Sequence, residues 1–416
     1  MDRKRAGSML RMWMVSLLAT TVLARGQAGG EKPRYVGSES CKGCHAAIYA
    51  GWKQTRMANV VRDPKTHPEA VLADFTHADP LVTFDLKDVA FVYGSKWKQR
   101  FFTKRGDDYF VQPAQWDVAK KRWLPYHVEP GTDWWEPFYG KTNEERPTGA
   151  LCDGCHSVNY DVKTKQVTEW NVGCERCHGP GSVHVAHPTR KNVVNPETLD
   201  YVRGNDTCIQ CHSQGRPLEQ TGFNTPGGKR FDWAVGYTAG DRLADVWVLE
   251  ELKPGVTNFL QYADMTAHKN RMQGNDFVQS TMYHRELRCF DCHEVHSNAN
   301  AANLKAVGNA LCLGCHAASA QNGAGLKGTV AEHTHHAEGS MGSECVACHM
   351  PRIEQTIKDN FVRSHTFRFI TPVLTEQSKV PNPCTSCHGD KTNAWALKEL
   401  KGWGTVSPWR MEQPAL

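Results

Sequence analysis

One arrangement of metal-binding side chains recurs along the sequence: two cysteines separated by two residues and followed immediately by a histidine. This CxxCH spacing occurs eight times, and the copies, numbered motif 1 to motif 8 in chain order, use all sixteen cysteines. The paired cysteines are Cys41 and Cys44, Cys152 and Cys155, Cys174 and Cys177, Cys208 and Cys211, Cys289 and Cys292, Cys312 and Cys315, Cys345 and Cys348, and Cys384 and Cys387. The motif histidines that follow them are His45, His156, His178, His212, His293, His316, His349 and His388.

Two kinds of metal site use these side chains. A structural zinc site takes four tetrahedral ligands, commonly one CxxC pair and a second pair farther along the chain. In a c-type haem the cysteines become thioethers to the porphyrin edge, and the histidine directly after them binds the iron. Neither a zinc site nor a disulfide framework requires a histidine after every second cysteine. The motifs therefore predict eight covalently attached c-type haems, with the motif histidines as proximal iron ligands.

The ligand on the opposite face of each iron decides the chemistry. A histidine or methionine there saturates the iron and leaves only electron transfer, whereas an empty or water-bound face permits turnover of a small molecule. His296 follows the motif histidine His293 by three residues, too close to reach the same iron from the other side. We therefore expect it to serve a neighbouring haem, and the turn-forming CHGPG predicts the same for His184 or His187. The candidate distal ligands are His184, His268, His296, His335, His336, His365, His127 and Met57.

Several of these assignments stay open at the level of sequence. The run HTHH offers His333, His335 and His336, of which we expect one or more to bind iron. Motif 1 has no obvious distal partner. Four residues compete for it: His67, His77, His127 and Met57. An ordinary surface or core role is an equal alternative for His67, His77, His187 and His284.

Residues 1–28 have the organisation of a secretory signal peptide. A basic start at Arg3, Lys4 and Arg5 precedes an apolar run from Met12 to Leu23 and then small residues. No later apolar run has the length of a membrane span. We expect cleavage near Ala28 and a mature protein, without a membrane span, in the periplasm or outside the cell.

The formal net charge of +5 overstates the basic character of the mature chain. Residues 1–28 hold five basic residues and one acidic residue, and their removal leaves a net charge of +1. The propionates of eight haems make the predicted holoprotein acidic, because each haem brings two of them. Nucleic acid is therefore not an expected partner.

The elements that position the motifs are predicted to be mainly α, with short helices, much irregular loop and close packing around haem. The long gap between motifs 1 and 2 differs from the rest of the chain. Aromatic and β-branched residues interrupted by RGDD and DVAKK predict a small β-hairpin or meander over residues 91–123. Its basic residues either dock an acidic redox partner or form the solvated face of a half-buried sheet. They are Lys96, Lys98, Arg100, Lys104, Lys120, Lys121 and Arg122.

The motif spacing suggests an internal organisation. Motifs 2, 3 and 4 are offset from motifs 5, 6 and 7 by 137, 138 and 137 residues. A duplicated haem triplet and similar spacing imposed by close haem packing both explain this pattern. We predict three regions after the signal peptide: residues 29–140 with motif 1 and the β insertion, residues 141–288 with motifs 2 to 4, and residues 289–416 with the second triplet and motif 8.

Seven segments resemble multihaem cytochromes of the cytochrome c-554 (c-552/4) type. They are CKGCHAAIYAGWKQTRMA, CERCHGPGSVHV, HKNRMQGNDFVQSTM, CFDCHEVHS, CVACHMP, SHTFRF and PNPCTSCHGDKTNAWA. The resemblance implies periplasmic or extracellular electron transfer through closely stacked haems, mostly ligated by two histidines. CHGPG and CHMP also resemble, more distantly, the pentahaem nitrite reductase and octahaem hydroxylamine oxidoreductase lineage. Against that lineage, the chain has no CxxCK motif and offers no clear counterpart of a tyrosine crosslinked to haem.

Two functions follow from the sequence. The preferred one is an octahaem electron carrier rather than an enzyme. Its predicted partners are other redox proteins: a quinol dehydrogenase, soluble cytochromes, and an outer-membrane conduit or extracellular acceptor. A homo-oligomer or a haem-linked filament is a further arrangement. The alternative function is an oxidoreductase in which one open-face haem reduces or oxidises nitrite, hydroxylamine or tetrathionate.

Overall fold

The computed structural model describes residues 32–126, 142–219, 231–297, 299–300, 302–319, 325–354 and 360–404. The predicted signal peptide over residues 1–28 and the candidate ligand His127 lie outside the described residues. The chain divides into two units, Met1–Pro33 and Arg34–Leu416. All elements belong to the second unit. No helix in the described ranges is both long and apolar enough to cross a membrane.

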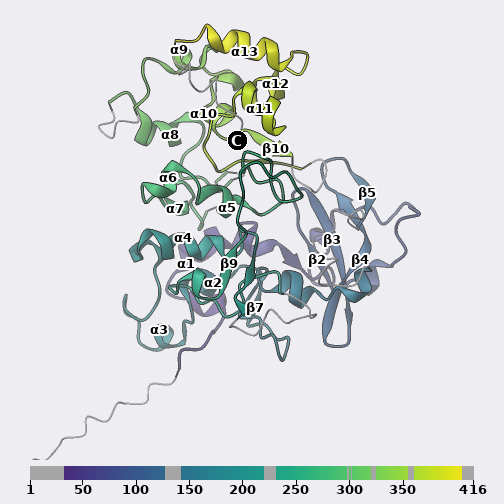
Figure 1. Ribbon diagram of the computed structural model, residues 1–416. Coiled ribbons are helices and arrows are strands. Elements are labelled where there is room, and N and C mark those ends of the chain that lie inside the picture. The colour runs from purple at the N-terminus through teal and green to yellow at the C-terminus, as the bar shows by residue number, and fades with distance from the viewer. Residues whose placement is uncertain are drawn as a thin grey trace, which may run out of the picture. The chain divides into compact units, whose positions relative to one another are not determined.

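The predicted meander is present as a five-stranded antiparallel sheet (Figure 1). Its strands follow each other in chain order and extend the predicted range at both ends. The sequence RGDD forms the tight connection between the third and fourth strands, where Gly106 has a φ of +63° that suits glycine. The strands are β1 (Val61–Arg62), β2 (Phe91–Tyr93), β3 (Lys98–Arg105), β4 (Asp108–Asp117) and β5 (Arg122–Pro125).

Aromatic side chains fill one face of this sheet. Phe101 is fully buried, and Phe75 packs edge-on against it and against Trp123, with ring centroids 5.3 and 5.1 Å apart. Edge-to-face contacts of this kind are the favoured arrangement of aromatic pairs. No motif cysteine or histidine belongs to this cluster. This cluster is therefore an apolar core apart from the haem motifs, whereas Val61, Tyr93 and Phe102 form a second cluster that packs against Cys152 of motif 2.

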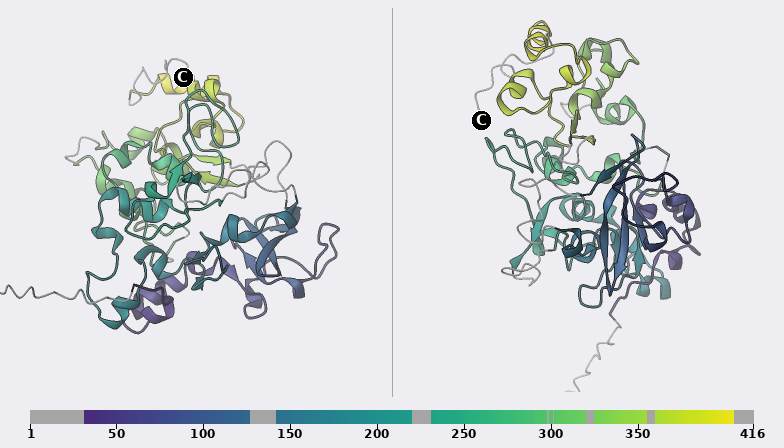
Figure 2. Two further views of the ribbon diagram at one scale, coloured as in Figure 1. Left: turned by 60° about the horizontal axis from the view of Figure 1, so that its bottom comes forward. Right: turned by 90° about the vertical axis from the view of Figure 1, so that its right-hand side faces the viewer.

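Outside the sheet, the described chain consists of short helices, two-stranded ribbons and irregular loops, in keeping with the predicted fold class. The helices from α8 onward, coloured green to yellow, gather together and carry motifs 6 to 8 (Figures 1 and 2). The helices are α1 (Ala46–Lys53), α2 (Cys174–His178), α3 (Ser182–Ala186), α4 (Tyr201–Ile209), α5 (Gln273–Phe277), α6 (Thr281–His284), α7 (Cys289–Cys292), α8 (Asn309–His316), α9 (Val330–Thr334), α10 (Cys345–His349), α11 (Pro372–Ser378), α12 (Pro383–Cys387) and α13 (Asn393–Lys401).

The ribbons pair antiparallel and connect the motif helices. They are β6 (Ser157–Val158) with β7 (Glu169–Trp170), β8 (Gly215–Pro217) with β9 (Trp247–Leu249), and β10 (Arg352–Glu354) with β11 (Phe361–Arg363). Short 3-10 turns, such as η1 (Ser38–Cys41), complete the motif segments.

Each CxxCH motif is close to one helical turn. The backbone N–H of the motif histidine donates to the carbonyl of the first cysteine, for example over 3.0 Å from His45 to Cys41 and 2.8 Å from His388 to Cys384. Side chains three and four residues apart share one helix face. The turn therefore presents both sulfur atoms and the imidazole on the same side, as attachment to one flat cofactor requires.

Candidate haem sites

All sixteen cysteines lie in described parts of the chain, and none of them forms a disulfide there. Eight of their sulfur atoms meet across motifs, close enough for thiol–thiol hydrogen bonds. First cysteines meet in three motif pairs, 1 with 3, 4 with 5 and 6 with 7, and second cysteines meet between motifs 2 and 4. The contacts join Cys41 to Cys174, Cys208 to Cys289, Cys312 to Cys345, and Cys155 to Cys211.

Weaker contacts connect these pairs to one another. Helix α2 of motif 3 packs on α4 of motif 4, and α10 of motif 7 packs on α12 of motif 8. Cys292 of motif 5 and Cys315 of motif 6 interact electrostatically. Every motif therefore neighbours at least one other, and the paired motifs 1 with 3 and 4 with 5 cross the boundaries of the predicted triplets.

Four motif histidines face a second histidine from a distant segment. In each pair the imidazole centroids are 6.1 to 6.3 Å apart, and in three pairs the ring planes lie within 17° of each other. The fourth pair has an angle of 33°. The facing residues are His45 with His184, His178 with His296, His349 with His333, and His388 with His336.

This separation fits one metal ion between two rings. Imidazole nitrogens bind such ions at about 2.0 Å, so two rings on opposite sides of one ion have their centres roughly 6 Å apart. Among the residues that the structure describes, no three or more His, Cys, Asp or Glu side chains form a cluster that could hold a metal ion. The ring separation of the four pairs suits haem iron with two axial histidines.

Hydrogen bonds also prepare the imidazoles for a metal. In five histidines the Nδ1 atom lies 2.5 to 3.1 Å from a backbone carbonyl, which fixes the proton on Nδ1. The Nε2 atom is then a free electron-pair donor, the usual outer-shell arrangement of a metal-binding histidine. These residues are His178, His184, His293, His336 and His365.

The run HTHH divides among three environments. His333, which is absent from the set of eight candidate distal ligands, faces His349, and His336 faces His388. His335 instead stacks on Trp403, with ring centroids 4.3 Å apart. The physical cause is the end of α9: His335 adopts a left-handed φ of 53°, so the chain turns between His333 and His336. His333 and His336 thus each lie opposite a motif histidine, and His335 lies against Trp403.

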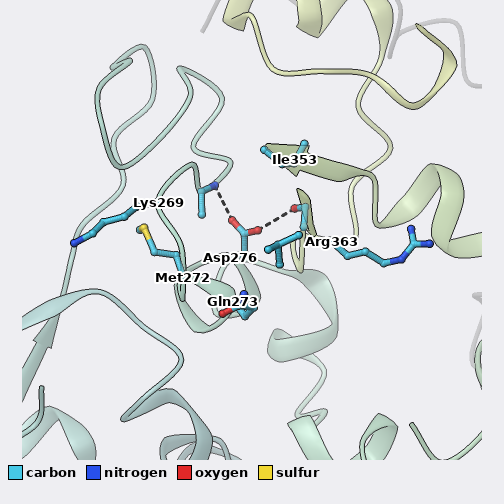
Figure 3. Close-up of a pocket in the computed structure, with 9 residues that line it drawn as sticks. Lys269, Met272, Gln273, Asp276, Ile353 and Arg363 are labelled. Carbon is cyan, nitrogen blue, oxygen red and sulfur yellow. Dashed lines mark hydrogen bonds between the residues drawn. The ribbon is translucent and has the colours of Figure 1, made fainter. Parts of the chain in front are cut away.

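His365 is held by a buried carboxylate. Asp276 of α5 accepts hydrogen bonds from the backbone N–H of Ala267, the hydroxyl of Ser364 and the N–H of His365, and Figure 3 shows the first two. Burial lowers the pKa of His365 to about 4, which keeps its imidazole neutral, as metal binding requires. The charges of His293 and then His212 act in the same direction. His365 therefore lies near motifs 5 and 4.

Other predicted candidates have different neighbours. The ring of His268 packs against Tyr262, with centroids 4.9 Å apart, and Met57 accepts a backbone hydrogen bond from Val172. His67 and His77 lie beside carboxylates at the surface, those of Glu69 and Asp74. His187 ends α3 in an exposed position, and His284 packs against Tyr283. The structure brings His184, and none of these, opposite His45.

Motif 2 has a distinct, charged environment. The His156 ring contacts Tyr93, whose hydroxyl donates to Asp153 over 2.8 Å. Burial raises the pKa of Asp153 to about 7. Arg271 places a guanidinium nitrogen 3.8 Å from the Cys155 sulfur and pairs with Asp232 at 2.6 Å. Buried ionisable groups therefore surround this motif.

The basic residues of the sheet differ in exposure. Lys98 is 6% exposed and forms a 2.7 Å ion pair with Asp117, so it does not face a partner. Arg100 lies over the Tyr126 ring and Lys104 over the Tyr109 ring. Of the predicted set, five residues are exposed: Lys96, Lys104 and, at the turn before β5, Lys120, Lys121 and Arg122. The idea of a docking face across all seven residues was wrong for Lys98, because burial takes it from the surface.

Known proteins resemble this chain at two levels. The sequence model of the family described as cytochrome c554 and c-prime matches residues 137–179, and that of the doubled CXXCH motif matches residues 284–321. No curated protein matches the chain. The outer cell wall cytochrome OcwA has a similar structure, with a TM-score of 0.67, 22% identity, and coverage of 89% of this chain and 86% of that one.

Two further structures are less similar. The undecahaem cytochrome from the S-layer of Carboxydothermus ferrireducens has 18% identity and a TM-score of 0.46, with coverage of 89% of this chain and 60% of that one. The octahaem sulfite reductase MccA of Wolinella succinogenes has 18% identity and a TM-score of 0.42, with 80% and 58% covered. The repeated CxxCH motifs, the two family matches and the fold shared with OcwA together identify the chain as a multihaem c-type cytochrome.

Proposed function

We propose that this protein is an octahaem electron carrier, with one c-type haem attached at each CxxCH motif. The observation that carries the proposal is the set of four facing histidine pairs with ring centroids 6.1 to 6.3 Å apart. A bound haem supplies a one-electron couple at its iron. Histidines on both faces close the coordination sphere, so these positions support electron transfer rather than substrate binding.

We assign the facing pairs as the axial ligands of four haems. The haems of motifs 1, 3, 7 and 8 take the pairs His45/His184, His178/His296, His349/His333 and His388/His336. We assign His365 to a further haem, because its Nδ1 atom lies 3.0 Å from the carbonyl of Arg363 and leaves Nε2 as the electron-pair donor.

The contacts between motifs supply an order for the electron path. From sulfur contacts, electrostatic contacts and helix packing we propose the motif sequence 1, 3, 4, 5, 6, 7 and 8. Motif 2 joins this path at motif 4 through the second cysteines, Cys155 and Cys211. The proposed path therefore has motifs 1 and 8 at its ends and motif 2 as a side branch.

The location and partners follow from the leader-like residues 1–28 and from the fold. The structure most similar in fold described above is an outer cell wall cytochrome. We place this protein in the periplasm or outside the cell, where it exchanges electrons with other redox proteins. A quinol dehydrogenase or cytochrome is the donor in this proposal, and an outer-membrane conduit or extracellular acceptor receives the electrons.

A second candidate function is reduction of a small nitrogen or sulfur compound at motif 2. It is favoured by the charged surroundings of that motif, where Arg271 lies beside Cys155 and Tyr93 beside His156. Arg271 is 22% exposed and paired with Asp232, and a cation in this position beside a haem attracts an anionic substrate such as nitrite.

One set of measurements separates the two functions. Mass spectrometry of the purified full-length protein counts the haems, and electron paramagnetic resonance of the oxidised protein counts high-spin iron. The carrier predicts eight haems, low-spin signals from the paired sites and reversible reduction without turnover. Turnover of nitrite, hydroxylamine or tetrathionate with a viologen donor, together with high-spin signal near one haem, would overturn it in favour of the enzyme.

A further inference from the structure

The same polar contact recurs in three motif pairs. The backbone N–H of the first cysteine in motifs 3, 5 and 7 donates to a side-chain oxygen three residues before the first cysteine of motifs 1, 4 and 6. The distances are 2.9, 2.9 and 2.8 Å. The donors and acceptors are Cys174 with Ser38, Cys289 with Asn205, and Cys345 with Asn309.

Two of these contacts are alike in a further detail. The Nδ2 group of Asn205 donates to the carbonyl of Leu287 over 3.0 Å, and that of Asn309 donates to the carbonyl of Ser343 over 2.8 Å. Both carbonyls belong to the residue two positions before the bound cysteine. Each asparagine side chain therefore makes two hydrogen bonds to the backbone of the neighbouring motif segment, one as donor and one as acceptor. Ser38 and Asn205 are buried, and Asn309 is partly buried.

The contacts fall on the same motif pairs in which first cysteines meet: 1 with 3, 4 with 5 and 6 with 7. An asparagine at the same position does not suffice to create them. Asn171, three residues before Cys174, bonds the backbone N–H and carbonyl of Val61 in β1 and no cysteine. The contact therefore marks particular motif pairs.

We propose that Ser38, Asn205 and Asn309 are positioning residues that lock the first cysteines of two motifs together and so set the separation of the two haems. The inference rests on the proposed electron-carrier function. A buried N–H without an acceptor is costly, so loss of the side-chain oxygen forces the backbone before the cysteine to move. A moved cysteine shifts the attached haem, which changes its potential and its electron exchange with the partner haem.

The test compares variants at matched positions in the full-length holoprotein. Asn309→Ala removes the acceptor for Cys345, Asn309→Ser keeps a neutral oxygen such as motif 1 uses, and Asn171→Ala is the control. Spectroelectrochemical titration measures the haem midpoints, and mass spectrometry counts the haems. We expect Asn309→Ala to keep eight haems and to shift the midpoints of two, Asn309→Ser to restore them, and Asn171→Ala to leave the haem midpoints unchanged.

An Asn309→Ala protein with eight haems and wild-type midpoints would overturn the inference, as would a serine variant that restores nothing. If Asn309→Ala does not fold, Ser38→Ala applies the same test to motifs 1 and 3. The proposed electron-carrier function is tested on the wild-type protein alone. It is wrong if that protein carries fewer than eight haems or is not reversibly reduced and reoxidised. The positioning role is wrong if the wild-type protein carries eight haems and is reversibly reduced, and the variants have the same haem midpoints as the wild type.

Discussion

The imidazole rings of His178 and His296 face each other with 6.1 Å between their centroids and 14° between their planes. One ring belongs to motif 3, and the other lies three residues beyond motif 5. The His178 Nδ1 atom is 2.7 Å from the carbonyl of Val194, which leaves its Nε2 atom for a metal.

Replacing His296 should remove one axial ligand without removing a haem. We expect His296→Ala to retain every covalent haem, because both cysteines of motif 3 remain, and to convert one low-spin haem to a high-spin one. Electron paramagnetic resonance calibrated against a haem count measures the change. His77→Ala is the control, since His77 is exposed and pairs with Asp74. An unchanged spectrum for His296→Ala would remove His296 from the ligands.

Glu175 should act as a clamp for motifs 1 and 3. Its carboxylate is buried and accepts hydrogen bonds from the N–H groups of Val36, Gly37 and Gly181, at 2.9, 2.7 and 2.7 Å through the oxygen nearest to each. Val36 and Gly37 precede η1, which leads into motif 1 and its histidine, His45. Gly181 precedes helix α3, which contains His184. Glu175→Ala leaves them without this acceptor.

We therefore expect Glu175→Ala to lower the free energy of unfolding by about 3 kcal/mol or more, since each buried unpaired group costs about 1–3 kcal/mol. The variant should also weaken the low-spin signal of one haem. Urea denaturation and electron paramagnetic resonance measure the two effects. Glu197→Ala removes an exposed carboxylate and serves as the comparison. Equal stability of the two variants would contradict the clamp.

The ion pair of Lys98 and Asp117 should stabilise the sheet. Both side chains are almost completely buried, at 6% and 2% exposure. Removing one partner of a buried pair typically costs about 3–5 kcal/mol, because the other charge stays in the interior. We expect a loss of this size for Lys98→Met in chemical denaturation, with an unchanged haem spectrum. Lys87→Met breaks an exposed pair with Asp85 and should change little; a similar loss in both variants would argue against the buried pair.

Asp276 should make stability fall as the pH rises. Burial raises its pKa from 3.8 to about 6, so the folded protein binds a proton that the unfolded chain has already released in this interval. Protonation of Asp276 therefore adds to the free energy of unfolding. This contribution is fully present below about pH 4 and is lost as the pH rises through 6, with an upper bound of about 3 kcal/mol.

Asp276→Asn tests this dependence, because the amide keeps an acceptor oxygen but does not titrate. Denaturation midpoints at pH 4.5 and pH 7 should differ less in the variant than in the wild type. The same difference in both proteins would exclude Asp276 as the source. The haem count serves as the control that both proteins are fully loaded.

Much of the local structure followed from sequence patterns. The CxxCH spacing requires one helical turn, and the alternation of aromatic and polar residues around RGDD predicted the meander that β2 to β5 form. The sequence did not predict β1, a two-residue edge strand whose pairing depends on β2. Lys98 looked like a surface residue because its partner Asp117 is a neighbour only once β3 and β4 have paired.

The sequence by itself determined the chemistry of this protein, because two cysteines and a histidine within five residues define a haem attachment turn without help from the fold. The tertiary structure decided which histidine faces which motif and in which order the motifs meet. His184 faces His45, and Asn205 binds Cys289, across long stretches of chain. Sequence spacing shows that a histidine just after a motif cannot bind the opposite face of the same iron. Which other motif that histidine faces depends on the folded backbone and on contacts such as these.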